Sequence, residues 1–587
     1  MTALRTAYAA SDAALDAALG DPEESAVRSA ALDAAEEFPA HLCARLDAFG
    51  LPAHYVPAEQ GGALTDHEQL LRLWRTVARR DLSALIAHGK TYLGAVPVWL
   101  AGDEEQTAAT AAAVLSARPV AWALSEPDHG ADLFGGTLTA TRHPGGYRLD
   151  GIKWPVNNAT RSSHLTLLAR TGTPGGARSH SLFLVNKSAL AAGTWHPLPR
   201  AATHGIRGID ISGLAFDGAT VPATALLGPE GTGVETVLRA LQLTRTMCAV
   251  LSLGAGEHAL RLTARFTAER VIQRRPLVDR PHPGAVLARC AALLAAVEAT
   301  ALVGARSIHG LTTELSVTSL VVKSLAPTLV DSVLGELAEL LGVRSYLTGV
   351  HAHGAFQKVR RDHQVVAVFD GSTPVNRSAL AQQFPRLVRG WTTGTVNADG
   401  LAETLSVGTA PRPLDLSELT LMSRHGSSVV QSLPALVESI AASGAPAGLA
   451  EHAAALRATA AALSGPLSEV RPAPRPPMQA YELAEAYELC FAGAACLHLW
   501  AAHHDRHAGE PLWQDGLWAR AALRALSARL ADVLRAPRPG PAPGDDHIDG
   551  RLARHICEST AIGAPVTPFG APMRIDTGDR PAEESTA

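Results

Sequence analysis

Apolar and polar residues recur along the chain with two different periods. Across residues 1–117 the apolar positions return every three or four residues, which predicts amphipathic helices. Between 118 and 230, short apolar runs are separated by glycine- and proline-bearing turns, as in a β-barrel or β-sandwich domain. Helical spacing returns over 231–392, where long Ala/Leu/Val-rich stretches are apolar enough to form the core of a helical bundle.

The last third of the chain, residues 393–587, is predicted to be a further set of helices. Proline-rich stretches at 471–477 and 536–544 interrupt it and are expected to be linkers. We expect residues 579–587 to be disordered. The predicted fold class is therefore α+β and multidomain: a helical domain, a central β domain, a helical bundle and a helical extension. A chain of 587 residues is long enough for several such units.

Composition narrows the functional classes. The chain is 47% hydrophobic and 18% charged, as expected of a globular protein, and its net charge of −5 disfavours a broad nucleic-acid surface. We find no apolar run of about 18 residues free of charge, so we predict no membrane span, and no signal peptide is visible. The cysteines form no close CxxC pair, which indicates reduced thiols in a cytoplasmic protein. They are Cys43, Cys248, Cys290, Cys490, Cys496 and Cys557.

One stretch, residues 361–373 (RDHQVVAVFDGST), carries the strongest candidate chemistry. An Arg-Asp pair leads an apolar run that ends in Asp370, which is followed at once by Gly371. A carboxylate in this setting can serve as a general base, and the glycine allows a turn or the close approach of a ligand. The alternative is that residues 370–373 only form the turn that closes a helix, and these residues alone favour that alternative.

Other sequence patterns provide weaker evidence of a functional site. His351, His353 and His363 have no cysteine or acid at ligand spacing beside the first two, so we predict no metal site. The glycine-rich residues 228–233 lack the Lys-Ser/Thr of a P-loop and are interpreted as a connector.

Three stretches, in this order, resemble signatures of the acyl-CoA dehydrogenase family. Residues 123–132 (ALSEPDHGAD) resemble its Thr-Glu-Pro-x-x-Gly-Ser-Asp motif. Residues 149–158 (LDGIKWPVNN) resemble its Gly-x-Lys-x-Trp-Ile-Thr-Asn strand, and residues 361–373 are similar to its Arg-Asp…Tyr-Glu-Gly-Thr segment. The resemblance covers roughly residues 30–390. The extension is similar in length and helical character to that of the very-long-chain branch.

The resemblance implies a four-helix bundle after the β domain, FAD bound between the two, and a homodimer or homotetramer. Asp370 stands where the family has the glutamate that removes the α-proton of an acyl thioester while the flavin accepts the β-hydride. Arg245 and Gly371 are the implied substrate contacts. The implied FAD contacts are Leu124, Ser125, Gly130, Ala131, Pro155, Asn157, Arg270 and Ser372.

The chain departs from the family pattern at several of these positions. Aspartate is one methylene shorter than glutamate, so the base reaches ~1.5 Å less far. Some members carry the base on a bundle helix just before an arginine, but Thr244 stands there and cannot act as one. The remaining departures surround one cofactor: Ala131, Pro155, Gln273 and Glu339.

Three functions follow as hypotheses. The first is FAD-dependent α,β-dehydrogenation of an acyl thioester, carried on coenzyme A or on a carrier protein, in specialised biosynthesis. The second is a non-redox or partner-subunit paralogue of the same fold with weakened or lost flavin binding. The third is a nucleic-acid-associated member of the family, which the net charge disfavours. The sequence does not identify the electron acceptor.

Overall fold

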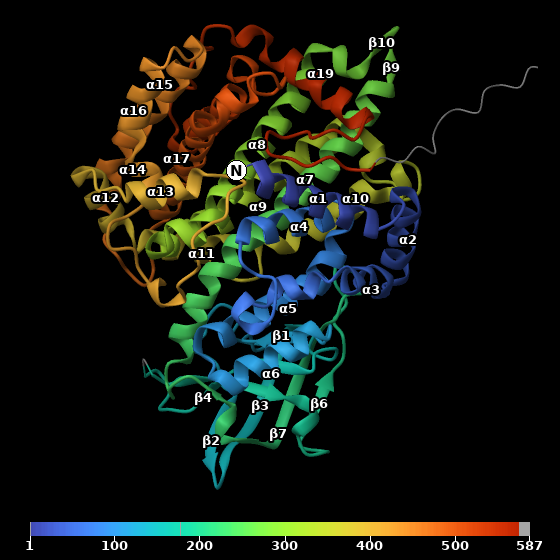
Figure 1. Cartoon of the computed structure of the whole chain (residues 1–587), viewed down its shortest axis with the longest axis vertical. Helices are drawn as coiled ribbons and strands as arrows, with labels where there is room; N and C mark the ends of the chain where they lie inside the picture. The colour runs from blue at the N-terminus through green and yellow to red at the C-terminus, as the bar shows by residue number, and fades with distance from the viewer. Residues whose placement is uncertain (1, 177, 575–587) are drawn as a thin grey trace, which may run out of the picture.

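The N-terminal part of the chain is a cluster of six helices. We describe the protein from a computed structural model that covers residues 2–176 and 178–574 (Figure 1). Two of these helices begin at aspartate N-caps. The Asp21 side chain accepts from the amides of Glu23 and Glu24, both at 3.0 Å, and Asp103 forms a capping box with Gln106. The helices are α1 Thr2–Ala18, α2 Pro22–Ala35, α3 Ala40–Phe49, α4 His67–Ala78, α5 Leu82–Ala101 and α6 Glu104–Leu115.

The central domain is built around one eight-stranded sheet in the order β6-β7-β3-β2-β4-β5-β8, with β1 paired to β4. Helix α5 packs directly on this sheet. The contact at Gly94 is so close that a Cβ there would come within 2.4 Å of the Val120 carbonyl oxygen, so only glycine fits. The strands are β1 Val120–Ala123, β2 Thr139–His143, β3 Gly146–Asn157, β4 His164–Arg170, β5 His180–Asn186, β6 Trp195–Leu198, β7 Ile211–Pro222 and β8 Leu226–Leu227.

Four long or medium helices then form a bundle, α7 Gly233–Glu269, α8 Pro281–Gly310, α9 Leu315–Leu341 and α11 Thr373–Ala381. A hairpin, β9 Val271–Ile272 and β10 Arg275–Pro276, follows α7, and α10 Ala355–His363 precedes α11. The regions 281–310 and 312–345 are long and apolar enough to cross a membrane. Their apolar windows are 94% and 83% buried inside the protein, as expected of core helices.

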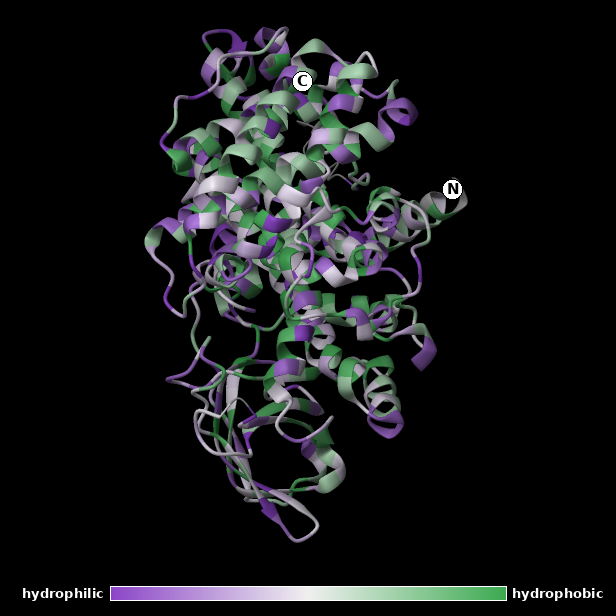
Figure 2. Ribbon diagram, turned by 90° about the vertical axis from the view of Figure 1, so that its left-hand side faces the viewer, coloured by the Kyte–Doolittle hydropathy of each residue, from purple (hydrophilic) through white to green (hydrophobic). Residues whose placement is uncertain are grey.

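The C-terminal extension packs along one side of the bundle, at the far end of the molecule from the β domain (Figure 1). Its helices α17, α18 and α19 lie on α8. Apolar residues concentrate in the helical part, whereas the tip of the β domain is polar (Figure 2). The helices are α12 Phe384–Thr393, α13 Ala398–Leu405, α14 Ser428–Gln431, α15 Leu433–Ala442, α16 Ala447–Glu469, α17 Met478–His503, α18 Leu517–Leu534 and α19 Ile548–Ala561.

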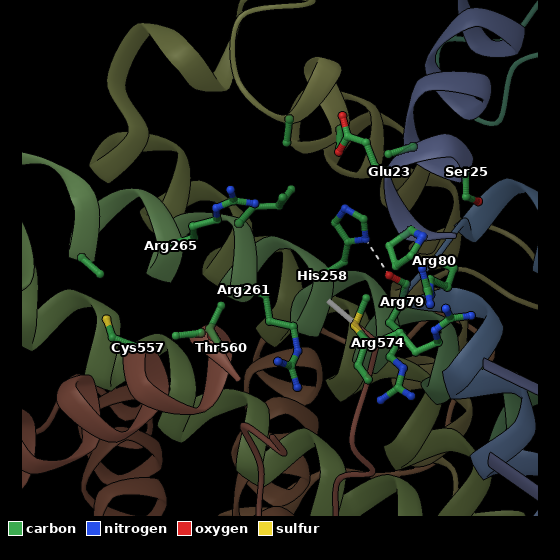
Figure 3. A pocket seen from close by; sticks show the side chains of 18 of the residues that line it. Glu23, Ser25, Arg79, Arg80, His258, Arg261, Arg265, Cys557, Thr560 and Arg574 are labelled. Atoms are coloured by element: carbon green, nitrogen blue, oxygen red, sulfur yellow. Dashed lines mark hydrogen bonds between the residues drawn. The ribbon is translucent and has the colours of Figure 1, made fainter. Parts of the chain in front are cut away.

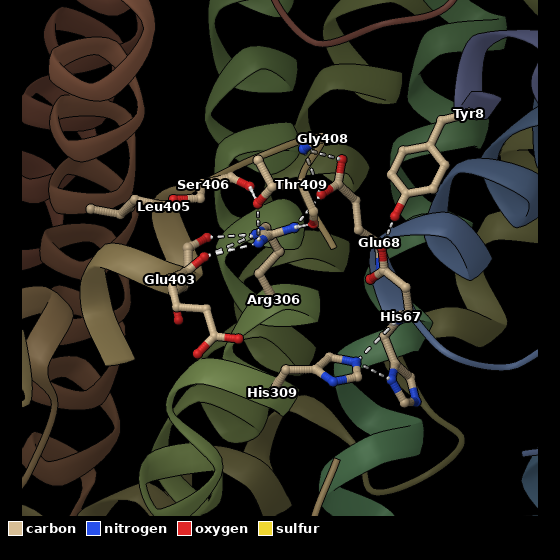
Figure 4. A network of polar contacts seen from close by, with 12 residues as sticks. Tyr8, His67, Glu68, Arg306, His309, Glu403, Leu405, Ser406, Gly408 and Thr409 are labelled. Carbon is tan, nitrogen blue, oxygen red and sulfur yellow. Dashed lines mark hydrogen bonds and ion pairs between the residues drawn. The ribbon is translucent and has the colours of Figure 1, made fainter. Parts of the chain in front are cut away.

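A buried ionic network ties the extension to the other units (Figure 4). Arg306 of α8 pairs with Glu68 of α4 at 2.6 Å and donates to the carbonyls of Glu403 and Thr404. Glu68 also accepts from the Gly408 amide at 3.0 Å. Burial alone would raise the pKa of Glu68, but the cations Arg72 and Arg306 hold it below its ordinary value. One carboxylate thus fixes three segments that are distant in the sequence.

This arrangement confirms the predicted fold class, with helical outer domains, a central sheet domain and extra C-terminal helices. The expectation of disorder for residues 579–587 falls outside the described residues.

Candidate active site

Asp370 lies in a tight turn between a short 3₁₀ helix, Gln364–Ala367, and α11. Its backbone is left-handed, with φ +55°, and that of Gly371 is too, with φ +89°. A Cβ on Gly371 would meet Arg245 Nη2 at 3.0 Å, so glycine also gives the arginine its space. Ser372 follows at the start of α11. Residues 370–373 therefore do form a turn, and this turn positions the Asp370 carboxylate, whose catalytic role stays a prediction.

Two residues of α7 hold Asp370 from one side. Arg245 Nε donates to its backbone oxygen at 2.8 Å, and the Cys248 thiol donates to its carboxylate at 3.3 Å. Burial and the neighbouring Asp370 raise the pKa of the Cys248 thiol, so it stays protonated as a donor. The structure thus brings Arg245, Asp370 and Gly371 together, and their roles toward a substrate stay a prediction.

Two lysines approach Asp370 from other helices. Lys90 of α5 lies 3.5 Å from the carboxylate and 3.5 Å from the centre of the Phe369 ring. Lys323 of α9 is 1% exposed and donates to the Val366 carbonyl at 2.6 Å. Burial lowers the pKa of Lys323 to about 8 and that of Arg245 to about 10. Lys90 thus contacts the candidate base directly, and Lys323 anchors the 3₁₀ helix that precedes it.

The predicted flavin contacts of the β domain also lie together. The Trp154 amide donates to the Ser125 carbonyl at 2.9 Å, and Lys153 Nζ donates to the Leu124 carbonyl at 2.9 Å, so β3 runs beside the end of β1. Pro155 and Asn157 lie two residues apart at the end of β3, where the pairing with β7 is irregular between Lys153 and Val156. Pro155 is exposed.

The remaining predicted contacts lie further out. Gly130 and Ala131 are exposed in the loop between β1 and β2. Arg270 is exposed at the C-terminal end of α7. It is 25 residues from Arg245 along this helix, a separation of about 37 Å, so it does not reach the same site in one subunit.

Helix α5 joins the two groups of residues. Asn158, directly after β3, donates to the Ala87 carbonyl at 2.8 Å, and Lys90 contacts Asp370 one helical turn further along. The end of β3 and the carboxylate of Asp370 are thereby placed against the same stretch of α5.

This geometry fits a flat aromatic ring system such as the isoalloxazine of FAD. The side-chain oxygen of Asn157 is buried and has no hydrogen-bond partner among the described residues. An amide at this position can pair with a polar ring edge. A Cβ on Gly130 would meet nothing within 4 Å, so a ligand can approach the backbone of this loop. Among residues 2–176 and 178–574, no group of three or more His, Cys, Asp or Glu could hold a metal ion.

Fold and site define a flavoprotein dehydrogenase architecture, and comparison with known families agrees. Models of the N-terminal, middle and C-terminal domains of acyl-CoA dehydrogenase match residues 22–118, 121–219 and 231–384. Together they cover more than half of the chain, which belongs to the acyl-CoA dehydrogenase family. The cofactor of this family is FAD.

Relatives are distant. The probable acyl-CoA dehydrogenase fadE25 of Mycobacterium leprae is 25% identical over 62% of this chain and 92% of its own length. The cyclohex-1-ene-1-carbonyl-CoA dehydrogenase of Geobacter metallireducens is 26% identical over 62% and 94%. Among solved structures, an acyl-CoA dehydrogenase from Bacillus anthracis complexed with FAD has a TM-score of 0.63 at 19% identity. It covers 90% of this chain and 87% of its own, so the similarity in fold includes most of the extension.

Sequence reasoning missed Lys90, Cys248 and Lys323. A signal existed for the lysines: Lys90 is the one Asp, Glu, Lys or Arg in α5, and Lys323 is the first such residue in α9. A lone lysine in an apolar helix needs a buried partner or a function. Thr244, the alternative base position, is fully buried and its hydroxyl has no hydrogen-bond partner among the described residues.

Proposed function

We propose that this protein is an FAD-dependent enzyme that oxidises an acyl thioester to its α,β-unsaturated form, with Asp370 as the base. The observation that carries the proposal is the placement of Asp370. Arg245 fixes its backbone, and α5 connects its carboxylate to the end of β3 where Asn157 lies. A positioned carboxylate beside a flavin face is what α-proton removal requires.

The chain's own residues account for the proton and for orientation. The Asp370 carboxylate takes the α-proton, a double bond forms between the α- and β-carbons, and the β-hydrogen leaves with its electron pair. FAD, when bound, supplies the acceptor for that hydride. Leu124, Ser125 and Asn157 would hold the ring, and Pro155 would cover part of it. Arg245 holds Asp370 in place through the hydrogen bond from its Nε to the Asp370 backbone oxygen. This bond does not involve the carboxylate, which can therefore act on the substrate.

The thioester carrier is proposed to be coenzyme A or an acyl carrier protein. Structural relatives are described with both: a butyryl-CoA dehydrogenase from Megasphaera elsdenii (TM-score 0.57, 20% identity) and the prolyl acyl carrier protein oxidase AnaB (0.56, 18%). The changes at Ala131 and Pro155 favour a specialised biosynthetic substrate. A cytoplasmic location is consistent with six cysteines that are all unpaired.

A homodimer or homotetramer is also proposed. Exposed apolar side chains occur in the β9–β10 hairpin and in the loop after α9, which packs on the end of α7 through His351 and Phe266. Contiguous exposed apolar surface of this kind is typical of an interface. The side chains are Val271, Ile272, Val343, Tyr346, Leu347 and Val350. Arg270 precedes the hairpin, where it could serve a neighbouring subunit.

The direct test combines spectroscopy with Asp370→Asn. Protein purified with FAD should show bound flavin absorbance, and acyl thioesters should bleach it. In Asp370→Asn we expect reduction to slow by about 10²–10⁴-fold, because the amide cannot accept the proton, while the flavin absorbance is retained. Undiminished reduction in the variant would contradict the role of Asp370.

A non-redox or partner-subunit role is the second candidate, favoured by the ion pair of Lys90 with Asp370 and by the exposed Pro155 and Ala131. Purified protein without flavin absorbance after FAD supplementation would support it. For the third, nucleic-acid-associated function, salt-sensitive DNA binding would be the supporting result.

A further inference from the structure

A cavity lies well away from Asp370, between α2, the end of α4, α7, α19 and the last described residues (Figure 3). Its volume is about 410 Å³, within the range of small-molecule pockets. Arg261, which lines it, is 16 residues from Arg245 along α7, a separation of about 24 Å. The cavity is therefore separate from the candidate active site.

The lining of this cavity contains polar atoms that the protein itself leaves unsatisfied. Arg79, Arg80 and Arg261 are 0%, 8% and 7% exposed. Each has at least one guanidinium nitrogen with no hydrogen-bond partner among the described residues. The same holds for one polar atom in each of three further lining side chains: the hydroxyls of Ser25 and Thr560 and Nε2 of His258. One buried acceptor without a hydrogen-bond partner, Glu257 Oε1, lies 3.5 Å from Arg261 Nη2. Because buried donors are almost always paired in native proteins, the number of donors left over still indicates room for a further acceptor.

The charge around the cavity has an excess of cations. Five arginines line it, against two lining carboxylates, Glu23 and Glu269, which pair with His353 and Arg265. Two buried carboxylates behind the wall also pair with these arginines: Glu257 lies 3.5 Å from Arg261 and 3.7 Å from Arg79, and Asp16 lies 3.0 Å from Arg80. Figure 3 shows the arginine side chains gathered largely on one side of His258, with Glu23 on the other. Burial lowers the pKa of both Arg80 and Arg261, which is the direction expected of cations with too few partners.

The existing contacts of these arginines leave one side of each guanidinium open. Arg80 uses Nε and Nη2 on Asp16, at 3.0 Å each, and keeps Nη1. Arg261 uses Nη2 on the Ala564 carbonyl at 2.7 Å and keeps Nε and Nη1. Nε and Nη1 point to different sides of the guanidinium, so each of them can donate one charge-assisted hydrogen bond to a separate acceptor oxygen.

We propose that this cavity binds a phosphate-bearing small molecule with an uncharged body. Several arginines converging from different elements match the charge and the multiple acceptor oxygens of a phosphate. The uncharged part is required by the rest of the wall, which includes Leu262, Ala268, Ala355 and Met573. His258 donates through Nδ1 to the Arg79 carbonyl at 2.6 Å, which leaves Nε2 to accept from a ligand hydroxyl.

Binding here would join three units of the protein. Arg79 and Arg80 follow α4 of the N-terminal domain, Arg261 belongs to the bundle, and Thr560 and Arg574 belong to the extension. A ligand that contacts all three stabilises the docked extension by mass action.

The test measures binding of glycerol 3-phosphate and inorganic phosphate by calorimetry, with sodium chloride at matched ionic strength as the reference. Wild-type protein should bind saturably, and its thermal midpoint should rise with ligand concentration. Arg261→Gln should weaken binding at least about tenfold, because a charge-assisted hydrogen bond is lost. Arg289→Gln should leave binding unchanged, because Arg289 is a partly exposed residue of α8 that pairs with Glu336 of α9.

The variant's own fold is checked without ligand. Because Glu257 keeps Arg75 at 2.8 Å when Arg261 is replaced, we expect Arg261→Gln to remain folded without phosphate, with a somewhat lower thermal midpoint than wild type. Should Arg261→Gln unfold, Arg80→Lys, which keeps the charge and loses the fork, supplies the same comparison. No saturable binding by the wild type, or full binding by the variants, would overturn the proposal. Tighter binding of decanoate than of glycerol 3-phosphate would replace the phosphate with a carboxylate and equally overturn it.

Discussion

At Asp370, the shorter acid and its setting belong together. Where a glutamate would extend further, the aspartate stays against Cys248 and Lys90, and its backbone is anchored by Arg245. A base held this closely reaches less far, so the α-carbon of the substrate has to come to it.

Lys323→Met is predicted to stabilise the protein and slow the reaction. Burial lowers the pKa of Lys323 from 10.5 to about 8, so the unfolded chain binds more protons between pH 8 and 10.5 and wild-type stability rises with pH through this window. Below pH 8 the buried ammonium group of Lys323 lowers the free energy of unfolding by its full amount, about 3 kcal/mol. The hydrogen bond to the Val366 carbonyl offsets about 1 kcal/mol of this cost.

Urea unfolding at pH 7 and pH 10.5 checks this prediction. We expect Lys323→Met to gain about 2 kcal/mol at pH 7 and nothing at pH 10.5. Lys323→Arg, which keeps a charge, is the matched control and should show no gain. A destabilised Lys323→Met at pH 7 would contradict the expectation.

Sequence reasoning about single residues succeeded where a side chain's partner is local and ran out where it is distant. The turn at Asp370-Gly371 follows from a local motif, whereas the proximity of Arg245, 125 positions away, was expected only from the family resemblance. The Lys90 contact to Asp370 joins residues 280 positions apart, and no local pattern encodes it. The exposed fraction of Val368, 63%, also shows that the apolar run before Asp370 is not buried throughout.

At the level of elements, α5 and α17 control the site from two sides. Helix α5 positions β3 and Asp370, as described above. Helix α17 of the extension binds Arg377 of α11 through Glu485 at 2.7 Å and Glu488 at 3.0 Å. Since α11 begins two residues after Gly371, the extension indirectly restrains the turn that carries the candidate base.

Glu68→Gln is predicted to destabilise the junction of α4, α8 and residues 403–409. Glutamine leaves Arg306 buried without its counter-ion, a change that costs about 3–5 kcal/mol. Chemical denaturation should show the loss of stability. Hydrogen exchange of the Gly408 amide should be faster in the variant, because in the wild type this amide donates to Glu68. The exposed Glu451→Gln is the control and should change stability by no more than about 0.5 kcal/mol. Equal stability of both variants would refute a structural role for the network.

Across the whole molecule, the order of the units was readable because sheet and helix leave different periods in the sequence. The family motifs then fixed how the first three units pack. The docking of the extension on α8 could not be read, because α8 is apolar on nearly every face and a uniform surface does not say which neighbour covers which side.

Deletion of residues 393–587 is predicted to give an aggregating protein. Helices α17, α18 and α19 cover α8, so their removal exposes an apolar surface too large for a soluble monomer. Size-exclusion chromatography of the soluble fraction should show little monodisperse protein compared with the full chain. A stable, monodisperse and flavin-binding truncated protein would show instead that the extension is dispensable for folding.

The burial of α8 by much later helices also has a consequence during translation. Helix α8 ends at Gly310. Of the helices that cover it, α9 and α13 follow soon after, but α17, the first of the three long extension helices on α8, begins only at Met478. At about 5–20 residues per second, the ribosome needs roughly 8–34 s to make the intervening 168 residues. For that time the nascent chain presents a partly uncovered apolar helix, so chaperone supply and elongation rate, more than final stability, should govern the yield of active protein in cells.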